Sequence, residues 1–204
     1  PEEPVPAPPV QMPGVKPIVA VASDFNAGFT PALAVNGTGL LGDLHQAQLG
    51  DVPLGWRSEP FTQLVGSDGI GVPAAGSGPQ FVLRLPGAVD LRKLRIWNGR
   101  VQSFDGVSYL NGESVRRVRV ETSSQLPLWQ ERGELVLTKG PGRFLAPYEE
   151  LEVDWDDVKA LRLTVLETYG NFVSEQGTIF NSVALSEVRL FGLMGELQVV
   201  GSSH

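Results

Sequence analysis

Apolar and polar residues alternate in short runs along most of this chain, which is the pattern of half-buried β-strands. The clearest run spans residues 181–192, where Val188 and Leu190 face one side and Glu187 and Arg189 face the other. Similar runs end at glycines or prolines and are too short for helices. The same alternation predicts strands at residues 16–23, 81–85, 94–97, 115–120, 134–138, 150–154 and 160–166.

Glycine and proline separate these runs. The 204 residues include Gly 24 and Pro 16, which favour turns over helices. We expect at most one helical turn, near residues 31–33, a turn at 122–127, and a long surface insertion at the glycine-rich residues 59–80. The pattern therefore predicts an all-β fold, a jelly-roll β-sandwich of about eight antiparallel strands.

The two ends of the chain differ from this pattern. Residues 1–14 contain six prolines and should be extended polyproline II, either a spacer or a ligand for a partner. The expected organisation is a proline-rich linker at 1–14, a sandwich at 15–195 and a tail at 196–204. Such spacers occur in exported proteins, and the start at Pro1 suggests processing, so an extracytoplasmic location (secreted, periplasmic or cell-surface) is expected.

Composition narrows the function. A net charge of −7 argues against nucleic-acid binding, and no apolar run approaches the ~20 residues of a transmembrane segment. The absence of cysteine excludes disulfides and thiol nucleophiles, and two histidines supply no Ser-His-Asp set and no zinc motif. The acidic residues at 149–157 are expected to form a solvated strand edge. The glycines at 37–42 match a nucleotide-binding motif, but the helix it needs is missing, so we interpret them as turn formers. The chain is not expected to be an enzyme.

Several segments resemble the discoidin domain, also called the coagulation-factor type C domain, of the galactose-binding-like jelly rolls. The resemblance runs from about Val15 to Gly192 and implies the same antiparallel sandwich. It is carried by Ala34-Val-Asn-Gly37 followed by Gly55-Trp56, by the paired strands at 81–85 and 94–98, by Val118–Ser124 followed by Leu128-Trp129, and by the closing strands at 161–165 and 185–192.

The resemblance implies a structural calcium ion where the early loop meets the last strand. Asn36 stands at the position of the family's aspartate, and Glu187 at that of its glutamate. Asparagine offers an oxygen ligand but removes a negative charge, which Asp43 or Asp51 could restore. The alternative is a metal-free loop held by hydrogen bonds to Glu187.

The resemblance also implies ligand binding through loops at one end of the sandwich, with glycans first and lipid head groups or proteins next. For Trp97 the competing interpretation is a core residue, and for His45 a plain loop residue. The insertion at 59–80 could extend the surface. The candidate ligand-binding residues are His45, Trp97, Asn98, Arg100, Tyr169, Asn171 and Phe172.

Two hypotheses follow. The first is a non-catalytic module that binds carbohydrate, with a glycan or surface protein as its partner. The second is a structural subunit that docks other proteins in a larger extracytoplasmic assembly and has no free ligand site.

Overall fold

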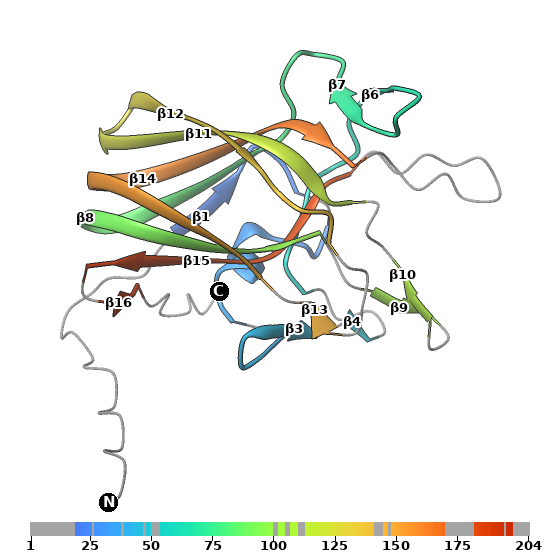
Figure 1. Cartoon of the computed structure of the whole chain (residues 1–204), viewed down its shortest axis with the longest axis horizontal. Helices are drawn as coiled ribbons and strands as arrows, with labels where there is room; N and C mark the ends of the chain where they lie inside the picture. Colours follow the sequence, from blue (N-terminus) through green and yellow to red (C-terminus); the bar gives the residue numbers. More distant parts are fainter. Residues whose placement is uncertain are drawn as a thin grey trace, which may run out of the picture.

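The structure, a computed structural model, describes residues 19–197 except 26, 38, 47, 50–53, 100–101, 105–106, 110–112, 141–144, 147, 170–181 and 194. Regular structure in these residues is almost entirely β-strand (Figure 1). The exception is one short 3₁₀ helix, η1 (Pro31–Ala34), at the place where the sequence predicts a helical turn. The predicted all-β class is confirmed.

Two long strands organise the sandwich. β8 (Gln80–Asn98) and β14 (Glu149–Thr168) pair antiparallel over most of their lengths (Figure 1). The sequence predicts two separate strands within each of them. The ribbon continues because register shifts near Trp155 and Val158 let it bend and then resume its pairing. Each long strand therefore contributes one half to each layer.

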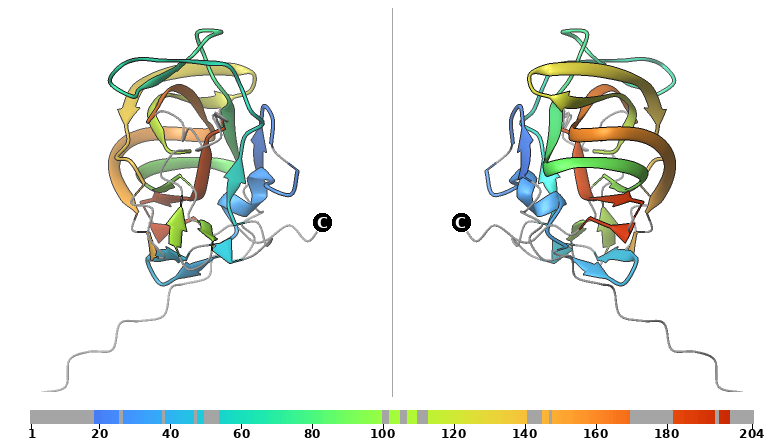
Figure 2. Two further views of the ribbon diagram at one scale, coloured as in Figure 1. Left: turned by 90° about the vertical axis from the view of Figure 1, so that its right-hand side faces the viewer. Right: turned by 90° about the vertical axis from the view of Figure 1, so that its left-hand side faces the viewer.

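The first layer has the strand order β12, β11, β14, β8, β1, and the second contains β14, β8 and β15 with short additions at its edge. Figure 2 shows both layers curving around a shared interior. The new strands are β1 (Val19–Ala22), β11 (Val115–Gln125), β12 (Leu128–Val136), β15 (Ala184–Gly192), β5 (Trp56–Arg57) and β16 (Gly195–Glu196).

β11 and β12 are longer than the sequence predicts. Gln125 pairs with Leu128, so the turn between them holds two residues, whereas a turn was expected at 122–127. That expectation was wrong because the serines and threonine of this stretch look like turn formers, yet Thr122 and Ser123 are buried strand residues. β16 likewise extends to Glu196, one residue beyond the predicted end of the sandwich.

The core lies between the layers and follows the period of two seen in the sequence. Val188 and Leu190 are buried, as predicted, and Trp56 packs against Phe81 with ring centroids 5.2 Å apart. Burial of each such side chain stabilises the fold by about 1.5–3 kcal/mol. Further core residues are Leu83, Leu94, Ile96, Val118, Val120, Leu161, Leu163 and Leu185.

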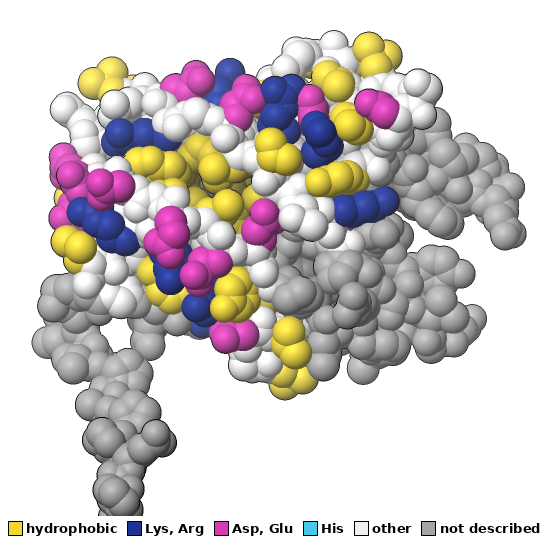
Figure 3. All heavy atoms as spheres, in the orientation of Figure 1, with side chains coloured by type: hydrophobic (Ala, Val, Ile, Leu, Met, Phe, Trp, Pro, Cys, Tyr) yellow, Lys and Arg dark blue, Asp and Glu magenta, His cyan; other side chains and the backbone are white. Residues whose placement is uncertain are grey.

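The acidic run at 149–157 forms an exposed edge, as predicted. Arg92 of β8 pairs with Asp154 and Asp156, and Lys93 pairs with Glu150. Figure 3 shows the result, with basic and acidic side chains interspersed over this face of the molecule.

Short strands surround one end of the sandwich. One small sheet contains β2 (Leu40–Leu41), β3 (Leu44–Gln46) and β13 (Leu145–Ala146), and another contains β4 (Gln48–Leu49), β9 (Gln102–Phe104) and β10 (Val107–Tyr109). The predicted insertion at 59–80 contains a hairpin of β6 (Gln63–Val65) and β7 (Gly71–Pro73), and β7 pairs with the end of β14.

Because β8 and β14 turn back halfway, both start and finish at the same end of the sandwich, which faces the viewer in the left panel of Figure 2. The connections after residues 98, 136 and 168 all leave from this loop end. It is the place where the sequence predicts a ligand. In the part of the chain described, no helix is long and apolar enough to cross a membrane.

Candidate functional site

Asn98 holds three segments together at the loop end. Its Nδ2 donates to the carbonyl oxygens of Val115 and Thr138, each at 2.7 Å, and its Oδ1 accepts from the backbone N–H of Val115 at 3.0 Å. The side chain is buried and uses both amide protons and its oxygen in these bonds. It therefore fixes the spacing of β8, β11 and the segment that follows β12.

Tyr169 also holds the segment that follows β12. Its hydroxyl donates to the carbonyl oxygen of Leu137 at 2.6 Å, and its backbone N–H donates to the carbonyl oxygen of Ser114 at 3.1 Å. The residues just beyond β12 are thus held between the ends of β8 and β14.

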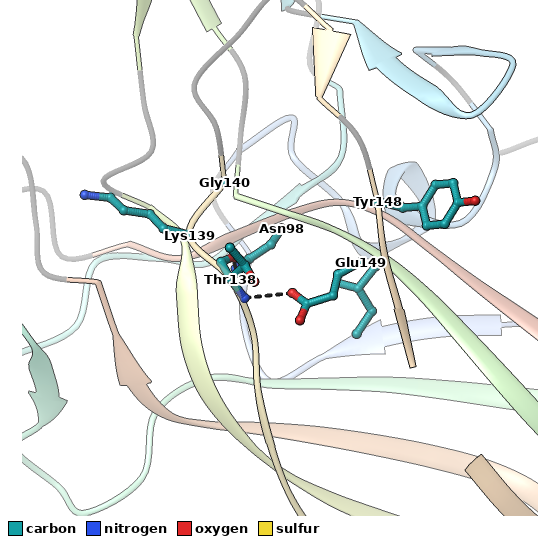
Figure 4. Close-up of a pocket in the computed structure, with 7 residues that line it drawn as sticks. Asn98, Thr138, Lys139, Gly140, Tyr148 and Glu149 are labelled. Carbon is teal, nitrogen blue, oxygen red and sulfur yellow. Dashed lines mark hydrogen bonds between the residues drawn. The ribbon is translucent and has the colours of Figure 1, made fainter. Parts of the chain in front are cut away.

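A hollow of about 240 Å³ opens beside this frame. Glu149 closes one side, because its Oε2 accepts a hydrogen bond of 2.7 Å from the backbone N–H of Thr138 (Figure 4). Lys139 and Tyr148 point to opposite sides in the same view. The residues that line the hollow are Ile96, Asn98, Thr138, Lys139, Gly140, Tyr148 and Glu149.

Tyr148 is held in place by its neighbours. Its ring meets the ring of Trp97 edge-on at 5.1 Å, and the guanidinium of Arg95 lies 4.2 Å from its centroid. Arg95 also lies over the ring of Phe191 at 4.8 Å and pairs with Glu150 at 2.8 Å. Cation–π contacts of this kind favour a fixed ring position.

The charges beneath Tyr148 are compensated. Hydrogen bonds from Arg95 and then Lys93 hold the pKa of the Glu150 carboxyl below its ordinary value. The ion pair with Glu150 in turn favours the charged form of Arg95 next to the tyrosine ring. The aromatic side chain at the hollow thus has a defined orientation.

The hollow offers groups for binding and lacks those for glycoside cleavage. It combines a half-buried aromatic ring, an exposed ammonium and backbone polar groups, which suit a ligand with both apolar faces and hydroxyls. Hydrolysis of glycosides normally needs two carboxylates, and Glu149 is the single carboxylate among the described residues that line it.

The sequence-predicted ligand residues lie mostly inside this frame. His45 is 1% exposed in β3 and packs against Gly39, and Trp97 is equally buried, with its Nε1 donating to the carbonyl oxygen of Asp43. His45 and Trp97 are not among the residues that line the hollow, whereas Asn98 lines it while its amide bonds to Val115 and Thr138. Their role as ligand contacts stays a prediction. For Trp97 the core interpretation is correct.

The loop predictions differ in outcome. Tyr169 is half-buried and turned inward to Leu137. Arg100, Asn171 and Phe172 lie outside the described residues, so their role as ligand contacts stays a prediction.

The early loop reaches the last strand where the sequence predicts it. The backbone N–H of Gly37, next to Asn36, donates to Oε1 of Glu187 at 3.0 Å. Glu187 is buried beneath the loop although it lies on the polar face of β15. Asp43, offered as a replacement charge, turns instead to Arg95 at 3.3 Å, and Asp51 lies outside the described residues. Calcium at this position stays a prediction.

Known structures share the fold of this chain. No protein-family model matches the sequence, and no curated protein is significantly similar to it. The F5/8 type C domain of a Bacteroides fragilis protein matches with 16% identity and a TM-score of 0.50, over 87% of this chain and 97% of that one. The chain has the discoidin-type fold.

Two carbohydrate-binding modules from Clostridium perfringens are similar to this discoidin-type sandwich. The family 32 module of NanJ, in complex with galactose, matches with 11% identity and a TM-score of 0.52, over 86% of this chain and 96% of that one. Another, in complex with GalNAc-β-1,3-galactose, matches with 13% identity and a TM-score of 0.51, over 88% and 100%. At these identities the likeness establishes the fold.

Sequence reasoning missed the hollow on this discoidin-type sandwich. Lys139 lies in a predicted turn, and Glu149 begins a predicted solvated edge. The two residues meet Asn98 only because Glu149 pairs with Ile96 across the bent ribbon. The one available signal was Tyr148, an aromatic residue directly before a strand at the loop end.

Proposed function

We propose that this chain is a non-catalytic carbohydrate-binding module that takes its ligand at the loop end. The observation that carries the proposal is the hollow, which Tyr148, with its ring held by Trp97, lines together with Lys139 and Glu149. A sugar presents an apolar face for the ring and hydroxyls for the charged groups.

The similar modules indicate which sugar class to test. Two of them hold galactose or GalNAc-β-1,3-galactose, so glycans that contain galactose or GalNAc are the class to test first. Residues 1–14 would act as a proline-rich spacer that displays the module outside the cytoplasm, to a surface glycan.

A glycan array followed by calorimetry with galactose and GalNAc tests this function. We expect saturable binding that weakens about tenfold in Tyr148→Ala, because ring stacking contributes about 1.4 kcal/mol. Lys139→Ala, which removes one hydrogen-bond donor, should weaken binding about fivefold.

Lys159→Ala is the matched control, because Lys159 is also exposed but lies at the opposite end of the sandwich. It should bind like the unmodified chain, and all variants should keep their thermal unfolding temperature. Two results would refute the proposal: no binding to any glycan on the array, or full binding by Tyr148→Ala and Lys139→Ala.

Protein docking, the second candidate function, has a narrower basis. Leu64 and Val72 form a cross-strand pair on the β6–β7 hairpin and are 68% and 42% exposed. Such a pair is small beside the contiguous apolar patches that mark protein interfaces. Carbohydrate binding is therefore the function we put first.

A further inference from the structure

A buried carboxylate at the junction of the early loop and the last strand needs a compensating positive charge. Glu187 is 1% exposed and accepts the Gly37 N–H, and a carboxylate in such a place is costly unless it is paired. In the discoidin resemblance a calcium ion fills this role.

The residues that the structure describes at this junction do not by themselves fit a calcium site. Calcium takes six to eight oxygen ligands, several of them charged. Here Asn36 is neutral, and Asp43 is engaged with Arg95 of β8. Among the residues that the structure describes, no three His, Asp or Glu side chains are grouped to hold a metal ion.

A cation of the chain itself stands at this junction. Arg189 lies two residues after Glu187 on β15, and therefore on the same face of the strand. Its Nε is 3.6 Å from Oε1 of Glu187, the oxygen that also accepts the Gly37 N–H. A second cation bound to the same oxygen would face the guanidinium at close range and be repelled by it.

The early loop is shaped around this guanidinium. Gly37 has a φ of +75°, and a Cβ built on it would lie 3.2 Å from Nη2 of Arg189. A side chain at position 37 would therefore press on the arginine, whereas glycine lets the loop backbone approach it.

We propose that Arg189 takes the place of the calcium ion, so that a built-in ion pair with Glu187 holds the early loop and the fold does not depend on calcium. This inference is independent of the proposed carbohydrate binding, since it concerns only the stability of the sandwich.

Thermal unfolding of the full chain in millimolar calcium chloride and in EDTA tests the inference. We expect the same unfolding temperature in both solutions. Arg189→Gln should lower that temperature by about 5 °C or more, because it leaves Glu187 buried without its cation. Arg84→Gln, which removes an exposed arginine from β8, is the matched control and should change it little.

A double-mutant cycle completes the test. Glu187→Gln together with Arg189→Gln should cost clearly less than the sum of the two single changes, because the two side chains act as a pair. Three results would overturn the inference: stabilisation of the unmodified chain by calcium, an Arg189→Gln variant as stable as the Arg84→Gln control, or strictly additive single changes.

Discussion

Polar residues at strand ends act in this molecule mainly as braces. Asn98, Tyr169 and Glu187 have the chemistry of ligand-binding residues, and each directs it at the backbone of a neighbouring segment. A loop end built from several non-local segments needs such bonds, because it has no continuous ladder to align them.

Asn98→Ala tests this role at the residue scale. The change removes the hydrogen-bond partner of three backbone groups. These are the carbonyl oxygen and the N–H of Val115, which is buried, and the carbonyl oxygen of Thr138. We expect the free energy of unfolding to fall by about 3 kcal/mol, measured by urea denaturation. Gln130→Ala, at an exposed position of β12, is the control and should stay within about 0.5 kcal/mol of the unmodified chain. An equally small effect at Asn98 would contradict the bracing role.

Neighbouring strands of the first layer are linked by ion pairs on their outer face. Arg162 of β14 makes two bonds to Glu121 of β11, at 2.7 and 2.6 Å, and its guanidinium lies 4.3 Å from the ring centroid of Trp129 on β12. One arginine thus connects three strands. Both members of the ion pair are largely shielded from water, which makes the pair stronger than an exposed one.

The pH dependence of stability tests this link at the element scale. The hydrogen bond from Arg162, aided by its charge, lowers the pKa of Glu121 in the folded chain. The unfolded chain, with an ordinary glutamate pKa near 4.3, therefore binds the proton first as the pH falls. The stabilisation is complete above about pH 4.3 and is lost as the pH falls through the lower, folded pKa.

Glu121→Gln should remove that contribution. We expect it to reduce the free energy of unfolding by about 1–2 kcal/mol at pH 7, and the difference from the unmodified chain to shrink at acid pH. Urea denaturation across pH 3 to 7 measures both. Glu131→Gln, on the exposed part of β12, is the control. A difference that stays constant over this range would show that the ion pair is not its cause.

The whole molecule is closed by the crossing of the early loop over the last strand. Gly55 has a φ of +86°, and a Cβ on it would lie 2.6 Å from the carbonyl oxygen of Leu185 and 2.7 Å from Cα of Ser186. Trp56 then pairs with Leu185. The backbone of Gly55 and β5 is therefore in direct contact with β15.

Gly55→Ala should therefore be much more harmful than an ordinary glycine substitution. Gly76→Ala is the matched control, since Gly76 has a φ of +79° but open space around it. We expect the control to lose about 1 kcal/mol from the backbone conformation alone, and Gly55→Ala to lose at least about 2 kcal/mol more. Thermal or urea denaturation measures the difference, and equal losses would rule out the close crossing.

Much of this architecture could be predicted from the sequence, because a period of two reports which residues face a core. The strands around Phe81, Leu94, Leu161 and Val188 were found in this way. The meeting of Glu187 with the early loop was instead expected from the resemblance to discoidin domains. The continuity of β8 and β14 was not, because Pro86 and Gly87 look like a break although the ribbon only bends there.

The candidate site was less predictable. Chemistry-bearing residue types suggested His45, Trp97 and Asn98, but no local pattern shows that His45 and Trp97 are buried or that the Asn98 amide bonds to Val115 and Thr138. Tyr148 and Lys139 are nine residues apart and come together through the pairing of β14 with β8. Contacts of that kind depend on the tertiary register, which a single sequence does not encode locally.

The passage of β8 and β14 through both layers also affects how the molecule comes apart. In a sandwich of two separate sheets, the sheets can come apart while each sheet keeps its strand pairing. Here β8 and β14 belong to both layers, so separating the layers would disrupt the pairing of both strands. Amide protons in both layers of the sandwich should therefore exchange with solvent in a single concerted opening. Under a mechanical load the described strands of both layers should therefore unfold together.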